Sequence, residues 1–130
     1  MGHALRRLGV RPEERVMMLL PDCPEFISSF FGTIKIGAVA VPVNTLLTTA
    51  DYVYLLNDSR ARVLIVHERI LDRVDQARSS AKHLKHVIVV GRGFVELLAA
   101  ESSELAAEEM HHDDAAFWLY SSGSTGFPKG

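Results

Sequence analysis

A chain of 130 residues is long enough to fold around one hydrophobic core. Its net charge of −2, with arginines that alternate with acids so that no basic stripe is predicted, gives no electrostatic case for nucleic acid or an anionic membrane as partner. The single cysteine, Cys23, excludes an internal disulfide, and no apolar run approaches membrane-spanning length. These features predict a cytoplasmic globular protein.

The start of the chain predicts the end of a helix and then a strand. Leu5 and Leu8, with Gly9 after them, are typical of a last helical turn closed by a glycine. Residues 15–20 form a short apolar run that Pro21 ends, which predicts a buried strand.

The second predicted helix begins after Asp22, which we expect to cap it, and stops at Gly37. Pro24 fits the first turn of such a helix. Apolar side chains at helical spacing predict the face that packs against a sheet, namely Phe26, Ile27, Phe30, Phe31 and Ile34. The polar side chains predict the opposite, solvent-facing side, namely Ser28, Ser29, Thr33 and Lys35.

Strands continue to alternate with helices along the chain. Strands are predicted at residues 38–43, 62–66, 86–90 and 116–120, and Pro42 places the first of them near the end or edge of a sheet. Thr48 and Asp51 have the spacing of a capping box, so a helix is expected to follow them and to end near residue 57. Further helices are predicted at residues 68–80 and 94–100, with a surface connector at residues 101–114. This alternation predicts an α/β fold, with a mainly parallel sheet and helices on both faces.

Residues 120–130 read Tyr-Ser-Ser-Gly-Ser-Thr-Gly-Phe-Pro-Lys-Gly and directly follow the last predicted strand. Glycines let the backbone approach a ligand closely, and successive backbone N–H groups favour anions. Hydroxyl side chains add donors, and Lys129 adds a compact positive charge suited to phosphate. Because ligands of parallel sheets bind beyond the strand ends, this segment is predicted to hold a polyphosphate.

Two better-known phosphate loops are excluded by the residues themselves. A Walker A loop needs glycine directly before its lysine, whereas Pro128 precedes Lys129 here. A dinucleotide fingerprint needs Gly-x-Gly, which residues 120–130 do not contain. The alternative interpretation is a glycine- and serine-rich turn without any ligand.

The segment at residues 121–130 resembles the phosphate-loop signature of the adenylate-forming superfamily, which includes acyl- and aryl-CoA ligases, luciferases and peptide-synthetase adenylation domains. Within that superfamily the chain is most similar to benzoate-CoA and 4-hydroxybenzoate-CoA ligases. The resemblance includes residues 20–26, 37–44, 55–61 and 114–120 and so covers nearly the whole chain. It implies that residues 1–130 are an interior piece of the large N-terminal AMP-binding domain, a single partial domain that ends in the phosphate loop.

The resemblance also implies a function for the longer protein to which this piece would belong. Such enzymes activate a carboxylic acid, here an aromatic one, as an acyl-adenylate with ATP and Mg²⁺, and then transfer it to coenzyme A as a thioester. The residues assigned to the ATP phosphates are Ser121, Ser122, Gly123, Ser124, Thr125, Gly126 and Lys129. The family's acyl pocket, adenine motif, magnesium-binding glutamate and catalytic lysine follow the loop, so the segment alone is expected to be inactive and to depend on the remainder of the polypeptide.

Two alternatives stay open. A fatty acyl-CoA ligase or a peptide-synthetase adenylation domain would use the same loop on another acid. A non-catalytic, flavodoxin-like interaction module would have the fold without the ATP chemistry.

Other candidate residues carry weaker signals. The histidine pairs, His83 with His86 and His111 with His112, lack the ligand set of a zinc site and are expected to be surface residues, as are Asp113 and Asp114. Cys23 stands near a helix start, which can lower a thiol pKa, but it has no base nearby in sequence and is interpreted as a packed thiol. No metal site is predicted.

Overall fold

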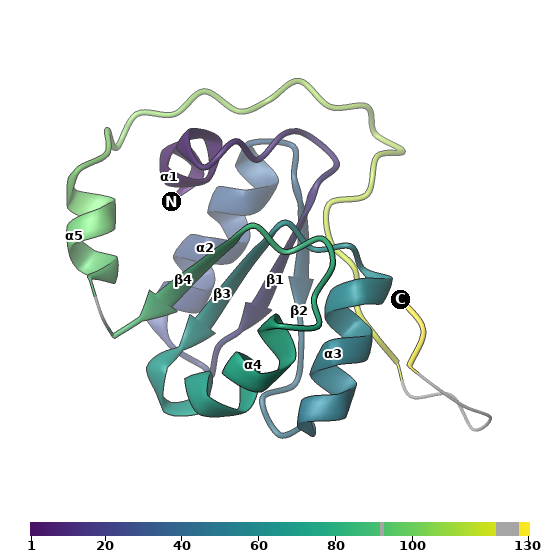
Figure 1. Ribbon diagram of the computed structural model, residues 1–130. Coiled ribbons are helices and arrows are strands. Elements are labelled where there is room, and N and C mark those ends of the chain that lie inside the picture. The colour runs from purple at the N-terminus through teal and green to yellow at the C-terminus, as the bar shows by residue number, and fades with distance from the viewer. Residues whose placement is uncertain (92, 122–127) are drawn as a thin grey trace.

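The computed structural model describes residues 1–91, 93–121 and 128–130, and within them the fold is a parallel sheet covered by helices on both faces (Figure 1). The sheet order is β2-β1-β3-β4, and all neighbouring strands are parallel. The strands are β1 (Arg15–Leu19), β2 (Val39–Pro42), β3 (Val63–His67) and β4 (His86–Val90). The helices are α1 (Gly2–Arg7), α2 (Pro24–Lys35), α3 (Thr49–Asp58), the 3-10 turn η1 (Glu68–Ile70), α4 (Leu71–Arg78) and α5 (Phe94–Ala99). The α/β architecture expected from the sequence is confirmed.

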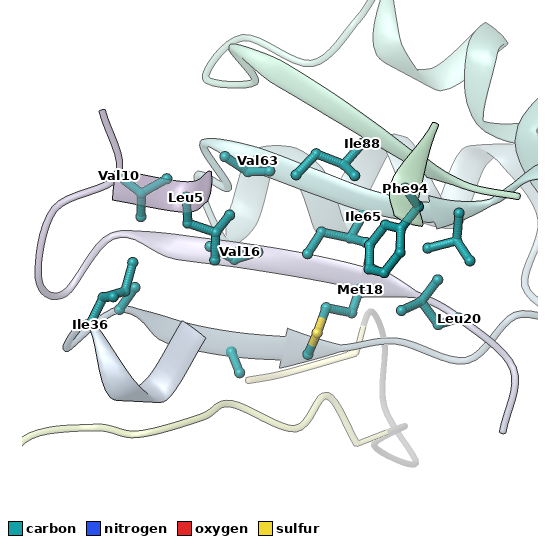
Figure 2. Packing of buried hydrophobic residues seen from close by; sticks show 13 residues of the cluster. Leu5, Val10, Val16, Met18, Leu20, Ile36, Val63, Ile65, Ile88 and Phe94 are labelled. Carbon is teal, nitrogen blue, oxygen red and sulfur yellow. The ribbon is translucent and has the colours of Figure 1, made fainter. Parts of the chain in front are cut away.

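The central strands are apolar on both faces because helices cover each face. Successive side chains of a strand point to opposite sides, so Leu64 and Ile65 of β3 enter two different hydrophobic clusters. Ile65 packs with residues of α1 and α5 in the cluster drawn in Figure 2, whereas Leu64 packs with residues of α3 and α4. Neither side chain is exposed to solvent.

Local signals at helix ends are confirmed in three places. After α1, the Gly9 N–H donates to the Arg6 carbonyl and the Val10 N–H to the Leu5 carbonyl, the paired bonds of a Schellman motif, and Gly9 has a φ of 79°. Gly37 ends α2 in the same way, with a φ of 73°. At the start of α3, Thr48 and Asp51 form the predicted capping box.

The predicted cap of α2 is wrong by one residue. Cys23, not Asp22, is the N-cap, and its side chain makes no capping hydrogen bond. The reason is Pro24 at the first helical position, which keeps the residue before it out of the helical region. Cys23 accordingly has an extended backbone with φ −144° and ψ 159°, so the helix begins directly after it.

The predicted inward face of α2 is also wrong in part. Ser29 and Thr33, expected on the solvent side, are the buried residues of the helix, while Ile27 and Phe31 are 59% and 63% exposed. Phe26, Phe30 and Ile34 do pack against the core, as predicted. The buried side of α2 is therefore rotated toward Ser29 and Thr33 and away from Ile27 and Phe31.

The last predicted strand, residues 116–120, is reduced to one isolated parallel bridge between Ala40 and Phe117. The Ala40 N–H donates to the Ala116 carbonyl, and the Trp118 N–H donates to the Ala40 carbonyl. The next donor that such a ladder needs on β2 is the N–H of Pro42, which proline lacks. The segment therefore leaves the edge of the sheet after a single pair, and the chain at residues 101–114 before it is an exposed connector with no helix or strand.

Candidate functional site

The predicted phosphate loop has its two ends joined to each other. The Ser121 N–H donates to the Lys129 carbonyl at 3.0 Å, and the Lys129 N–H donates to the Ser121 carbonyl at 3.1 Å. Residues that exchange both bonds lie directly opposite in an antiparallel pair, and their side chains point to the same side. The structure thus brings together one predicted hydroxyl donor and the predicted cation, and both residues are exposed.

The other residues assigned to phosphate binding lie outside the described part of the chain. These are Ser122, Gly123, Ser124, Thr125 and Gly126, within the segment 122–127. Their contacts with phosphate remain a prediction from the sequence.

Helix α3 contacts both ends of this loop. The Tyr54 hydroxyl donates to the Pro128 carbonyl at 3.1 Å, and the Tyr120 hydroxyl donates to the Asp58 Oδ2 atom at 2.6 Å. Tyr54 and Asp58 are four residues apart and therefore lie on one face of the helix. The sequence signal for these two residues is only their four-residue spacing on a predicted helix, because their partners are distant in sequence.

Tyr120 is held by more than its hydrogen bond. Burial, and after it the hydrogen bond to the Asp58 carboxylate, raise the pKa of the Tyr120 phenol well above its ordinary value and so favour the protonated form that donates this bond. A Cβ atom added at Gly130 would lie 3.0 Å from the ring, so the backbone there runs close against Tyr120. Two residues earlier, the Trp118 ring lies under the Arg15 guanidinium, with 5.6 Å between Cζ and the ring centroid.

A small cavity of about 170 Å³ lies between the carboxyl end of β2, α3 and the base of the loop. Its lining residues are Pro42, Val43, Asn44, Leu47, Leu55, Tyr120 and Pro128. The carboxyl ends of parallel strands are where such sheets bind ligands, so the loop base stands at the expected edge of the fold.

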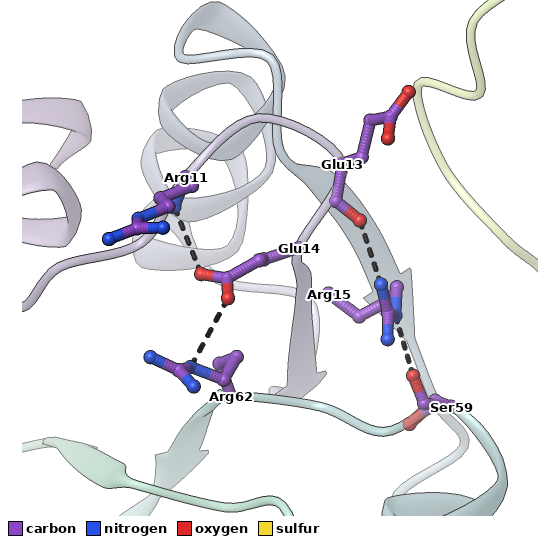
Figure 3. Close-up of polar contacts among 6 residues, drawn as sticks. All are labelled: Arg11, Glu13, Glu14, Arg15, Ser59 and Arg62. Carbon is purple, nitrogen blue, oxygen red and sulfur yellow. Dashed lines mark hydrogen bonds and ion pairs between the residues drawn. The ribbon is translucent and has the colours of Figure 1, made fainter.

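Basic side chains gather at the opposite edge, where the strands begin. A pocket of about 370 Å³ is lined by Arg15, Arg60, Arg62, Lys82, His83 and Lys85, together with Glu14. The expectation that basic residues do not gather is wrong here, because parallel strands bring the residues that precede them to one edge. Figure 3 shows how two of them are held: the Arg15 Nε atom donates to the Ser59 carbonyl at 2.7 Å, and Arg62 pairs with Glu14 at 3.4 Å.

The predicted surface position is confirmed for His83, His111, His112 and Asp113, whereas His86 and Asp114 are partly buried. The possible ligand atoms of His111, His112 and Asp113 lie within 4.8 Å of one another, so this histidine pair does have an acid beside it. All three side chains are exposed. Cys23 is half-buried, and burial, as the largest cause, raises the pKa of its thiol, the opposite of what its place near a helix start suggests.

A parallel sheet with helices on both faces defines an α/β domain, a class in which ligands usually bind beyond the carboxyl ends of the strands. The chain belongs to the AMP-binding enzyme family, because the family model with that description matches residues 1–130. Nothing among the helices described in residues 1–91, 93–121 and 128–130 has the length and apolarity to cross a bilayer.

Three similar proteins are CoA ligases of aromatic acids. The chain is 42% identical to a benzoate–CoA ligase of Thauera aromatica and 41% identical to a 4-hydroxybenzoate–CoA/benzoate–CoA ligase of Rhodopseudomonas palustris, in each case over 99% of this chain and 25% of the relative. A crystal structure of an anthranilate CoA ligase in complex with anthranoyl-AMP superposes with a TM-score of 0.94 at 43% identity, covering 98% of this chain and 25% of that one. The chain therefore spans about a quarter of the length of the relatives it matches.

Proposed function

We propose that the full-length protein carrying this chain is an ATP-dependent ligase that joins an aromatic carboxylic acid to coenzyme A. The observation that carries the proposal is the signature loop, with Ser121 paired to Lys129 at its base, in a chain of the AMP-binding family. The names of the relatives support the aromatic acid, since the benzoate–CoA and hydroxybenzoate–CoA ligases are 42% and 41% identical to the chain.

The proposed reaction has two displacements. A carboxylate oxygen of the acid attacks the α-phosphorus of ATP, the bond from that phosphorus to the bridging oxygen breaks, and pyrophosphate leaves with the electron pair. The thiol sulfur of CoA, after losing its proton, then attacks the acyl carbon and displaces AMP, which leaves the thioester.

The chain's own contribution is proposed to be electrostatic. Hydroxyl groups and N–H groups from Ser121 onward, with the Lys129 ammonium, would hold the β- and γ-phosphates and stabilise the charge that builds on the departing pyrophosphate. Mg²⁺ bound to ATP would add further positive charge there. Among the described loop residues, a serine hydroxyl and an ammonium fit phosphate oxygens and provide no carboxylate for the metal, so this part of the chain would hold the phosphates.

We propose further that residues 1–130 are one part of a larger AMP-binding domain and form no acyl-adenylate alone. The coverage of about a quarter of each relative supports this. The 130-residue chain, mixed with ATP and benzoate, should therefore give no ATP–pyrophosphate exchange. Exchange above background would contradict this part of the proposal.

The test of the loop uses the full-length protein. ATP–pyrophosphate exchange with benzoate should fall about 100-fold in Lys129→Gln and Thr125→Val, because each removes a group proposed to stabilise the leaving phosphates. A matched control is Lys35→Gln, which removes an exposed cation from the end of α2. Exchange rates equal to wild type in both loop variants would refute the phosphate assignment.

A fatty-acid substrate is the second candidate. A long-chain-fatty-acid–CoA ligase of Mycobacterium tuberculosis is 35% identical over 97% of this chain. Benzoate, 4-hydroxybenzoate and palmitate compared at equal concentration separate the two, since an aromatic-acid ligase should turn over palmitate much more slowly.

A further inference from the structure

Hydrogen bonds hold both ends of the phosphate loop, to α3 and to each other. One end is held at Tyr120 by Asp58, the other at Pro128 by Tyr54, and the two ends bond to each other through Ser121 and Lys129. Both helix residues come from α3, which begins with a side-chain capping box and packs Tyr52, Leu55 and Leu56 fully into the core. A rigid helix therefore contacts both sides of the loop.

The bond to Asp58 is the stronger of the two anchors. A phenol that donates to a carboxylate at 2.6 Å forms a charge-assisted hydrogen bond, which is about twice as strong as a neutral one. Asp58 is exposed, and the Tyr120 side chain is half-buried against the cavity between α3 and β2. The Asp58 carboxylate therefore lies against the Tyr120 hydroxyl, at the first end of a loop that is expected to receive anionic phosphates.

We infer that Asp58, Tyr120 and Tyr54 are positioning residues that set the affinity for ATP by fixing both ends of the phosphate loop on α3. This rests on the proposed function. None of the three is expected to contact phosphate. With both described ends fixed, Ser121 and Lys129 are already in place when ATP binds, so their binding costs less conformational freedom and anchoring strengthens affinity without a new contact.

The test measures KM for ATP and KM for benzoate separately in the full-length protein. Tyr120→Phe and Asp58→Ala should each raise KM for ATP about tenfold, the factor that loss of one charge-assisted hydrogen bond produces, and leave KM for benzoate unchanged. Asp58→Asn keeps an acceptor oxygen for the phenol and should fall between wild type and Asp58→Ala. Tyr54→Phe, which loses a neutral bond, should raise KM for ATP by about threefold.

Two controls separate anchoring from general damage to the fold. Tyr52→Phe removes the other tyrosine hydroxyl of α3, which donates to the Asn44 carbonyl, and Asp72→Ala removes an exposed aspartate from α4. Both should leave KM for ATP within about twofold of wild type. The double variant Tyr120→Phe/Asp58→Ala should raise KM no further than either single change, because the two residues act through one bond.

Hydrogen exchange tests the anchors even if the protein has no ligase activity. In the absence of nucleotide, the amides of Ser121 and Lys129 should exchange about tenfold faster in Tyr120→Phe and Asp58→Ala than in wild type. No pyrophosphate exchange in wild type with any acid would defeat the proposed function, and this measurement would then decide the anchoring. Unchanged hydrogen exchange at Ser121 and Lys129 in both variants overturns the inference. An unchanged KM for ATP in an active Asp58→Ala enzyme overturns it as well.

Discussion

Helices α2 and α3 cover opposite faces of the same sheet and do so in different ways. α3 turns large apolar side chains inward and keeps Tyr52, Leu55 and Leu56 almost wholly out of solvent. α2 turns Ser29 and Thr33 inward and leaves Ile27 and Phe31 exposed. Exposed apolar side chains continue beyond α2, since the Phe30 ring contacts both Phe31 and the exposed Phe117.

The difference teaches that helix spacing alone does not decide which face is buried. α2 packs against another helix, α1, as well as against the sheet. The two helices come so close that a Cβ atom added at Gly32 would lie 2.7 Å from the Met1 side chain and 3.1 Å from the Gly2 nitrogen. Small residues permit this approach, so the small and polar side of α2 turns inward. α3 meets the sheet through its apolar face, as its sequence pattern predicts.

The largest change in the free energy of unfolding is expected on the buried side of α3. Leu56→Ala on α3 removes a side chain that is 1% exposed and should lower the free energy of unfolding by about 2–5 kcal/mol, because it leaves a cavity. Urea denaturation of the chain measures it, with Leu46→Ala, an 81% exposed leucine, as the matched control. A cost below 1 kcal/mol would mean that α3 is no better packed than α2.

A smaller effect of opposite sign is expected at the inward face of α2. Among the described residues the buried Ser29 hydroxyl has no hydrogen-bond partner, so Ser29→Ala should raise the free energy of unfolding by about 1 kcal/mol. Thr33→Val is the contrasting variant, since the Thr33 hydroxyl donates to the Ser29 carbonyl at 2.7 Å, and it should lower stability by a similar amount. The same denaturation curves report both, and a destabilised Ser29→Ala would show that the hydroxyl has a partner.

The smallest effect belongs to the outer side of α2. Phe31→Ser changes a ring that is 63% exposed and should alter the free energy of unfolding of the 130-residue chain by no more than about 0.5 kcal/mol. A cost near that of Leu56→Ala would place Phe31 in a packed environment and remove the contrast between the two helices.

The sequence predicted those parts of the fold that depend on neighbours in the chain. Strands buried on both faces, such as Val63–His67, appear as continuous apolar runs, and the capping box joins Thr48 to Asp51, only three residues later. The inward side of α2 could not be predicted, because it is chosen by contact with Gly2 of another helix. The short pairing at residue 117 likewise depends on Pro42, far away in the sequence.

The candidate site likewise has a part that the sequence predicts and a part that depends on the tertiary fold. Loop chemistry follows from residue types that stand side by side, so Ser121 and Lys129 could be proposed from the sequence. Their direct pairing, and the contacts of Tyr54 and Asp58 with the loop ends, depend on the tertiary fold. A phenol and a carboxylate on distant segments carry no pattern that predicts their meeting.

The anchoring bonds also bear on how the chain folds. They join residues 62 and 74 positions apart, a wider separation than the helix caps and turns that can form early. Closing such long loops costs entropy that is recovered only once α3 has settled on the sheet. We therefore expect the loop base to form late in folding, so that the proposed nucleotide site would be complete only in a chain whose core is already packed.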